Sequence, residues 1–192
     1  MKVWVGCWWE AVCALAVPMV IQVGFRLWDQ GGDWGAVGEI AATWVAGTVV
    51  WAAVAWLSLR HRAHRSGIAL ASDALAAHQT RRLRVLRPSV GLRAELKSSP
   101  RASVTAEKGR EEIWFHWRPG RRNRTVWGSI AFDEGAGTVR LDLRASGVYT
   151  GSSGLRRGAS FVALCQVAGG LGLSEENENE NEGEGAGEAR VA

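Results

Sequence analysis

The chain carries four histidines, His61, His64, His78 and His116, and their spacing is the first test for metal or acid–base chemistry. His61 and His64 are three residues apart and share a face if they lie on a helix. A zinc site needs further ligands at suitable spacing, and neither the cysteines nor the carboxylates of this chain supply them. His116 is expected on a strand, facing solvent. We therefore expect no metal, no cofactor and no catalytic histidine.

The sequence also lacks the residue patterns that are typical of nucleophilic catalysis. The chain has three cysteines, Cys7, Cys13 and Cys165. Their number is odd and no two have CxxC spacing, so no disulfide framework is expected. Cys7 and Cys13 lie in an apolar run, where a free thiol behaves as a small hydrophobic group. The glycine- and serine-rich stretch at 147–158 lacks the spacing of a phosphate-binding loop, and no G-x-S-x-G turn is present. The sequence therefore predicts a protein that is not an enzyme.

Glu10 is the single residue whose position suggests chemistry, because it lies inside the first apolar run. An acidic side chain within a membrane span is by default a candidate for proton or cation coupling. The alternative is that Glu10, about two helical turns from the amino terminus, is shallow enough to reach water or pair with Lys2. The sequence leaves both interpretations open.

Arginines recur in clusters that are expected to contact an anionic surface. One cluster directly follows the apolar run at residues 40–59 and contains Arg60, Arg62 and Arg65. Another cluster contains Arg81, Arg82 and Arg84. The last cluster is expected at a hairpin tip and contains Arg121, Arg122 and Arg124. Near an anionic leaflet each charge adds about 1 kcal/mol of attraction. Tryptophans flank the third cluster, a pattern that also occurs in nucleic-acid binding. A membrane-tethered domain meets anionic lipid head groups instead, so we expect anionic lipid or an acidic protein as partner and disfavour nucleic acid.

The second apolar run determines where these charges lie. Residues 40–59 carry no charge, and twenty helical residues rise about 30 Å, the hydrocarbon thickness of a bilayer. Trp44 and Trp56 lie near its two ends, and the basic cluster that follows indicates the cytoplasmic side. Small residues four apart, Thr43 and Gly47, have a spacing that allows close helix packing. We expect a transmembrane helix here.

The first apolar run, residues 3–25, is interrupted by Glu10, Pro18 and Gln22. A retained span makes a two-helix hairpin over residues 1–59, with the carboxy-terminal part in the cytoplasm. The alternative is a secretory signal peptide cleaved after residues 14–16, which leaves that part on the same side. Retention of the span predicts a multi-pass protein of the cell membrane.

Beyond the hairpin, residues 60–87 are expected to form a basic juxtamembrane helix or linker, with a break at Ser66–Gly67. Residues 88–173 are expected to form a small β-rich cytoplasmic domain, because the apolar period changes to two. The expected strands cover 112–118, 124–132 and 138–144, with weaker ones at 90–96 and 102–107. They predict an antiparallel meander or partial barrel of four or five strands, covered by residues 159–173 as a last strand or short helix.

Charge is distributed unevenly about the net value of +4. Lys and Arg outnumber Asp and Glu between residues 60 and 173, whereas residues 174–192 carry seven glutamates among asparagines and glycines. That composition predicts a disordered tail, either solvated or masking the basic region.

Together these patterns predict a non-enzymatic membrane anchor or interaction module that contacts anionic lipid or an acidic partner. One alternative is an oligomeric transport or channel component that uses Glu10, in which case copies of the chain associate. A further alternative is a reading frame whose product has no function.

Overall fold

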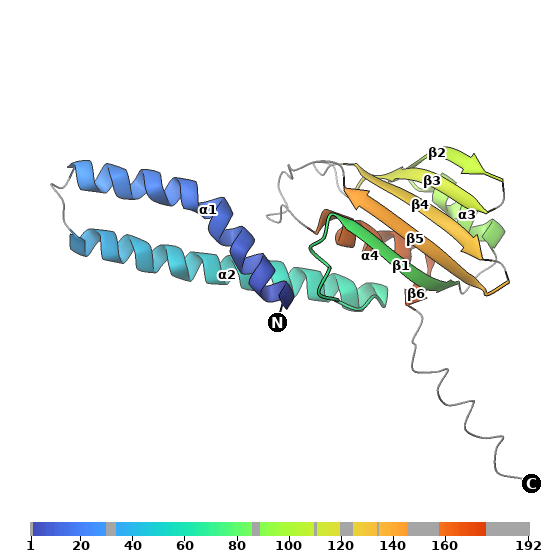
Figure 1. Ribbon diagram of the computed structural model, residues 1–192, viewed down its shortest axis with the longest axis horizontal. Coiled ribbons are helices and arrows are strands. Elements are labelled where there is room, and N and C mark those ends of the chain that lie inside the picture. The colour runs from blue at the N-terminus through green and yellow to red at the C-terminus, as the bar shows by residue number, and fades with distance from the viewer. Residues whose placement is uncertain are drawn as a thin grey trace, which may run out of the picture.

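The computed structural model describes residues 2–29, 34–85, 89–109, 111–119, 125–133, 135–145 and 158–175. Figure 1 shows a long helical hairpin that projects from one end of a domain made of a sheet and helices. The elements in chain order are α1 (Lys2–Asp29), α2 (Trp34–Ser66), β1 (His78–Val85), α3 (Ser89–Ser98), β2 (Ala102–Lys108), β3 (Glu112–Trp117), β4 (Val126–Asp133), β5 (Thr138–Ala145), α4 (Ala159–Leu171) and β6 (Leu173–Glu175).

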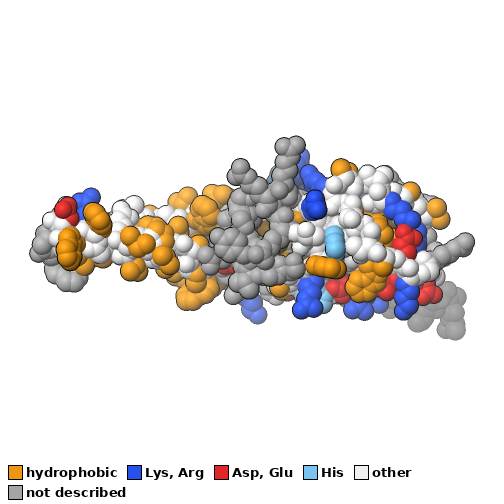
Figure 2. Space-filling view, turned by 90° about the horizontal axis from the view of Figure 1, so that it is seen from above, with side chains coloured by type: hydrophobic (Ala, Val, Ile, Leu, Met, Phe, Trp, Pro, Cys, Tyr) orange, Lys and Arg blue, Asp and Glu red, His pale blue; other side chains and the backbone are white. Residues whose placement is uncertain are grey.

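Both hairpin helices are long and apolar enough to cross a membrane, each with a stretch of mean hydropathy 1.7. Only 6% of that stretch in α1 and 17% of that in α2 is buried inside the protein, whereas the core helix of a soluble protein is mostly buried. Figure 2 shows charged side chains gathered on the sheet domain and at the far tip of the hairpin, with mainly apolar and uncharged surface between. Length, composition and exposure therefore suggest membrane association.

The contact between α1 and α2 does not use the four-residue spacing of Thr43 and Gly47. Thr43 and Gly47 are exposed, and a side chain added at Gly47 would meet nothing within 4 Å, so this pair does not bring α1 and α2 together. The helices instead bury residues near the sheet domain: Val3, Cys7, Glu10 and Ala11 of α1, and Thr48, Ala52, Ala55 and Leu59 of α2. Nearer the tip, Trp44 Nε1 donates a hydrogen bond to Gln22 Oε1 at 3.2 Å.

Helix α1 bends along its length in Figure 1, and Pro18 lies inside it. Proline lacks the backbone N–H that a helix interior needs, and its ring displaces the preceding turn. The bend brings the amino-terminal turns of α1 against the segment that follows α2. There a side-chain carbon added at Gly6 would lie 2.5 Å from Leu75 Cδ1, so glycine permits this close approach.

Helix α2 runs beyond the first arginine cluster and ends at Ser66, where Gly67 adopts a left-handed backbone with φ 66°. The expected break at Ser66–Gly67 is therefore confirmed. Residues 67–77 form a connector that leads from α2 to β1. A helix or linker was expected over residues 60–87, and this expectation is wrong for residues 78–85 because they form the strand β1. Those residues pair antiparallel with β5 along seven positions. Packing across a sheet overrides the weak strand propensity of this arginine-rich segment.

The sheet has six strands in the order β2-β3-β4-β5-β1-β6, with antiparallel pairing throughout. The meander expected from residues 102–107, 112–118, 124–132 and 138–144 is confirmed as β2 to β5. The sheet is not closed, and it has six strands where four or five were expected. The strand expected at 90–96 is also wrong, because this segment forms α3 and buries Leu92 and Leu96, one helical turn apart.

Helices α3 and α4 lie together behind the sheet in the view of Figure 1. Helix α4 confirms the helical alternative for residues 159–173 and buries Phe161, Leu164 and Val167. The expected inward alternation is confirmed: Ile113, Phe115, Trp117, Val126, Ile130, Val139, Leu141 and Leu143 are buried. At Gly128 a side-chain carbon would lie 2.5 Å from Phe115 Cζ and 2.7 Å from Leu143 Cδ2, so these two side chains fill the space above the glycine.

The expectation of a disordered tail over residues 174–192 is wrong for Ser174 and Glu175, which belong to β6 and pair with β1. Residues 176–192 lie outside the described residues, and so do Arg121, Arg122 and Arg124.

Candidate functional site

The sheet face opposite α3 and α4 is covered by no described helix, and we call it the open face (Figure 1). It collects the side chains that alternate with the buried ones on four adjacent strands: His78, Thr80, Arg82 and Arg84 of β1; Glu112, Trp114 and His116 of β3; Trp127, Ser129 and Ala131 of β4; Arg140, Asp142 and Arg144 of β5. Such alternation is typical of an antiparallel sheet with one solvated face.

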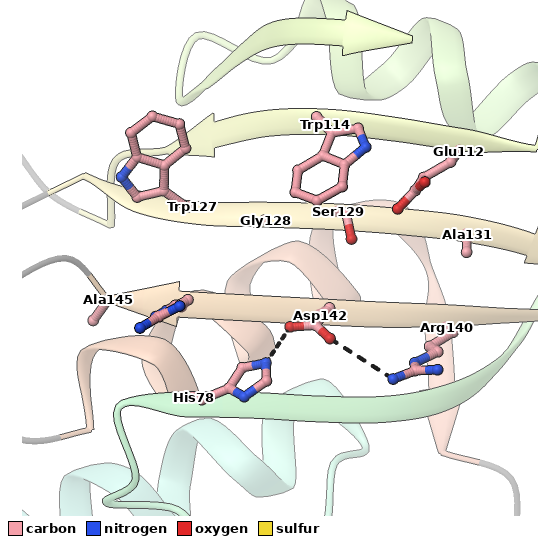
Figure 3. A pocket seen from close by; sticks show the side chains of 11 residues that line it. His78, Glu112, Trp114, Trp127, Gly128, Ser129, Ala131, Arg140, Asp142 and Ala145 are labelled. Atoms are coloured by element: carbon pink, nitrogen blue, oxygen red, sulfur yellow. Dashed lines mark hydrogen bonds and ion pairs between the residues drawn. The ribbon is translucent and has the colours of Figure 1, made fainter. Parts of the chain in front are cut away.

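A hollow of about 810 Å³ lies on the open face. The hollow forms because β4 contributes small side chains to its floor, Ser129 and Ala131, between larger side chains of the neighbouring strands (Figure 3). The strand register places Ser129 between Trp114 of β3 and Asp142 of β5. It places Ala131 between Glu112 and Arg140 in the next row. Aromatic, acidic and basic groups therefore surround one depression.

Two tryptophans form the largest exposed apolar surface on this face. Trp114 is 47% exposed and Trp127 is 50% exposed, although neighbouring residues of β3 and β4 on the other face are fully buried. The His116 ring lies edge-on to Trp127, with ring centroids 3.9 Å apart and an interplanar angle of 76°. Large apolar groups rimmed by polar ones mark interaction surfaces.

Asp142 is the carboxylate nearest the centre of the open face, and its charge is already engaged. His78 Nε2 contacts Asp142 Oδ1, and the Thr80 hydroxyl donates to Oδ2 at 3.2 Å. Arg140 Nη2 lies 4.0 Å from Oδ2 (Figure 3). Asp142 therefore offsets little of the charge on the remaining arginines.

The arginines of β1 and β5 stand close together. Arg82 of β1 lies directly opposite Arg140 of β5. Like charges at directly opposed positions of an antiparallel pair are destabilising. A bound anion would relieve this repulsion, so the β1–β5 half of the open face is suited to an acidic ligand.

Serine, histidine and aspartate share this face without forming a catalytic triad. Ser129 is opposite Asp142, and His78 belongs to the next row, where its Nε2 contacts that carboxylate. A nucleophilic triad needs the histidine between serine and aspartate. Among the described residues, no group of three His, Cys, Asp or Glu could hold a metal ion.

Arg81, expected to contact an anionic surface, points to the covered side and is engaged within the protein. Its Nη2 and Nη1 donate to the two Asp73 oxygens at 2.6 and 3.0 Å, and its Nε lies 3.6 Å from Glu175 Oε1. The hydrogen bonds from Arg81 hold the pKa of Asp73 below its usual value, and Asp73 in turn raises that of Arg81. Arg81 is therefore a structural residue that ties the connector to β1 and β6.

The other expected arginines that the structure describes lie in three places. Arg82 and Arg84 lie on the open face, on β1. Arg62 and Arg65 line a second groove, between α2 and α4. Arg60 lies over the Trp56 ring, with its guanidinium carbon 5.3 Å from the ring centroid.

Arg140, Arg144 and His78 were not among the expected site residues. The alternation of residues 138–144 already indicated that Arg140, Asp142 and Arg144 share the polar face of a strand. The missing information was that residues 78–85 form the neighbouring strand, which pairs with a segment about sixty positions away.

No protein-family model, no curated protein and no solved structure matches this chain.

Proposed function

We propose that this protein is a non-enzymatic interaction module, anchored in the cell membrane by α1 and α2, whose open face binds an acidic protein partner in the cytoplasm. The observation that carries the proposal is the uncovered sheet face, where half-exposed Trp114 and Trp127 lie beside the arginines of β1 and β5.

The residue types on the open face support binding rather than catalysis. Tryptophan and arginine contribute a large share of the energy of protein interfaces, because they combine large contact area with specific polar groups. Trp114 and Trp127 supply the apolar anchor, and Arg82, Arg140 and Arg144 supply positive charge next to it.

The direction of the open face favours a protein partner over the surface of the anchoring membrane. Figure 1 looks onto the open face while the hairpin runs across the picture, so this face runs alongside the hairpin rather than across its end. A membrane crossed by the hairpin would meet the sheet edge-on. Trp114 and Trp127 would then face away from the lipid, toward soluble partners.

The test uses the full chain in detergent micelles, with bound cytoplasmic proteins identified at several salt concentrations. We expect an acidic partner whose binding weakens as salt rises. Trp114→Ala/Trp127→Ala and Arg140→Gln/Arg144→Gln should each abolish its capture. Val90→Ser is the matched control, since Val90 is 75% exposed on α3, on the opposite side of the sheet. An unchanged set of bound proteins in both double variants would refute binding through the open face.

The anchor is tested separately by washing membranes with carbonate and by adding protease to intact cells that carry a carboxy-terminal tag. We expect the chain to stay in the membrane pellet and the tag to be protected. Release into the supernatant would refute the anchor, and digestion of the tag would refute the cytoplasmic location.

The second candidate function is transport or conduction, and it is favoured by the burial of Glu10 between the helices, at 7% exposure. The hydrogen bond between Trp44 and Gln22 sets an antiparallel register that places Glu10 near the level of Trp56. That level is about one turn before Arg60, near the end of the uncharged run. This shallow depth favours the anchor. Flux in liposomes that is abolished by Glu10→Gln but survives disruption of the open face would establish transport instead.

A further inference from the structure

A second groove, of about 440 Å³, lies where the end of α2 meets α4, and we call it the helix-end groove. It is separate from the open face, because α4 belongs to the layer on the other side of the sheet (Figure 1). Helix α2 lines it with Ser58, His61, Arg62, Arg65 and Ser66, and helix α4 with Cys165, Gln166, Gly169 and Gly170.

The position of the groove along α2 matches the depth of lipid head groups. Ser58 lies in the last turn of the uncharged run, and Arg65 lies about 10 Å farther along the helix axis. A bilayer with about 30 Å of hydrocarbon is about 40–45 Å thick with its head groups, so each head-group layer is about 5–8 Å deep. If α2 crosses the membrane, the groove therefore opens at the head-group layer. This inference rests on the anchor in the proposed function.

The charge of the groove suits a phosphate group. The lining includes two guanidinium groups and the His61 imidazole, and it contains no carboxylate. Within the described part of the chain, neither Arg62 nor Arg65 makes an ion pair, in contrast to Arg81. Guanidinium groups bind phosphate oxygens through paired N–H donors, which gives geometric fit as well as attraction.

The opposite wall is open because two consecutive helical residues lack side chains. Gly169 and Gly170 lie inside α4, where glycine is less stable than alanine. Packing does not require glycine there. A side-chain carbon at Gly170 would meet nothing within 4 Å, and one at Gly169 would lie 3.9 Å from Ser66 Cβ. The missing side chains widen the groove in front of the arginines.

We propose that the helix-end groove binds the phosphate head group of an anionic phospholipid of the inner leaflet, with Arg62 and Arg65 donating hydrogen bonds to its oxygens. The lipid would contact α2, which belongs to the anchor, and α4, which covers the sheet. It would thereby hold the sheet domain in one orientation relative to the membrane.

The experiment measures which lipids the purified full-length chain retains, by native mass spectrometry after solubilisation from phosphatidylcholine vesicles that contain phosphatidylglycerol. We expect preferential retention of phosphatidylglycerol. Arg62→Gln/Arg65→Gln should weaken that preference about 100-fold, since each variant loses a hydrogen bond to a charged phosphate, which contributes about tenfold. Gly170→Trp should abolish it by filling the groove without changing charge. Arg60→Gln removes one charge of the same arginine cluster outside the groove and should leave the preference intact.

Each other outcome overturns the proposal. A loss of about fivefold in Arg60→Gln, the amount expected for any one charge near an anionic leaflet, would show a general charge effect. Full retention in Gly170→Trp would show that the lipid lies elsewhere. Competition by inorganic phosphate as strong as that by phosphatidylglycerol would assign the groove to a free anion. Circular dichroism and gel filtration of each variant confirm that it is folded. A chain that remains in carbonate-washed membranes but shows no lipid preference disproves the groove alone, whereas release from those membranes disproves the anchor.

Discussion

Replacing Arg81 by methionine tests how the connector is held against the sheet. The guanidinium group joins Asp73 of the connector to β1 through hydrogen bonds of 2.6 and 3.0 Å, and its Nε lies 3.6 Å from Glu175 of β6. The Arg81 side chain is only 16% exposed, whereas that of Asp73 is 45% exposed. One partner is thus largely enclosed and the other is partly solvated.

The expected size of the effect follows from that difference in exposure. A hydrogen bond to a charged group contributes about 1.5–3 kcal/mol when it is shielded from water. Solvent around Asp73 screens the pair, so we expect Arg81→Met to lower the free energy of unfolding by only about 1 kcal/mol. In a domain of this size, that lowers the melting temperature by about 4–8 °C.

The pair also predicts a pH dependence of stability. The hydrogen bonds from Arg81 lower the pKa of Asp73 from its ordinary value of 3.8, so the folded protein releases this proton more readily than the unfolded chain. The stabilisation is therefore complete above about pH 4 and is lost as pH falls through the lowered pKa. Asp73→Asn should be less stable than the wild type at neutral pH, and this difference should vanish in acid.

The assay is thermal unfolding of the full chain in detergent, followed by near-ultraviolet circular dichroism, for the wild type, Arg81→Met, Asp73→Asn and the double variant. Hydrogen exchange of residues 67–85 reports local loosening of the connector and β1. If Arg81→Met costs as much in the Asp73→Asn background as in the wild type, the two side chains are not coupled and the reasoning is refuted.

Three further outcomes are expected. Gly128→Val should destabilise the sheet domain by about 1–3 kcal/mol in thermal unfolding, because Phe115 and Leu143 fill the space that the new side chain needs; an unchanged melting temperature would contradict this packing. If the open face binds an acidic partner as proposed, deleting residues 176–192 should tighten that binding, measured by titration at low salt, because the six glutamates of this segment carry the same charge as the partner and would compete with it; weaker binding would show that the segment assists it. Burial raises the pKa of the Cys165 thiol, so its alkylation at neutral pH should be slow until the protein is unfolded, and rapid labelling of the folded chain would disprove its enclosure.

Local sequence patterns were sufficient to predict those helices and strands whose period and solvent preference are encoded in neighbouring residues. The uncharged run at 40–59 predicted a long apolar helix, because helix rise relates residue count to length directly. Alternation in residues 112–118 and 138–144 predicted both the strands and their inward faces, because successive strand residues point to opposite sides. Gly67 ended α2 at the expected place, since glycine adopts the left-handed backbone without steric cost.

The tertiary structure alone decided which of these elements became neighbours. Residues 78–85 resemble a basic linker in isolation, and only pairing with β5 and burial of Gln79 and Leu83 make them a strand. That pairing placed Arg82 beside Arg140 and turned Arg81 inward toward Asp73. In the same way, packing of α4 on the end of α2 created the groove that holds Arg62 and Arg65. A local sequence pattern determines the period of an element and whether its side chains prefer water or an apolar environment. Which elements become neighbours depends instead on packing between segments far apart in the chain.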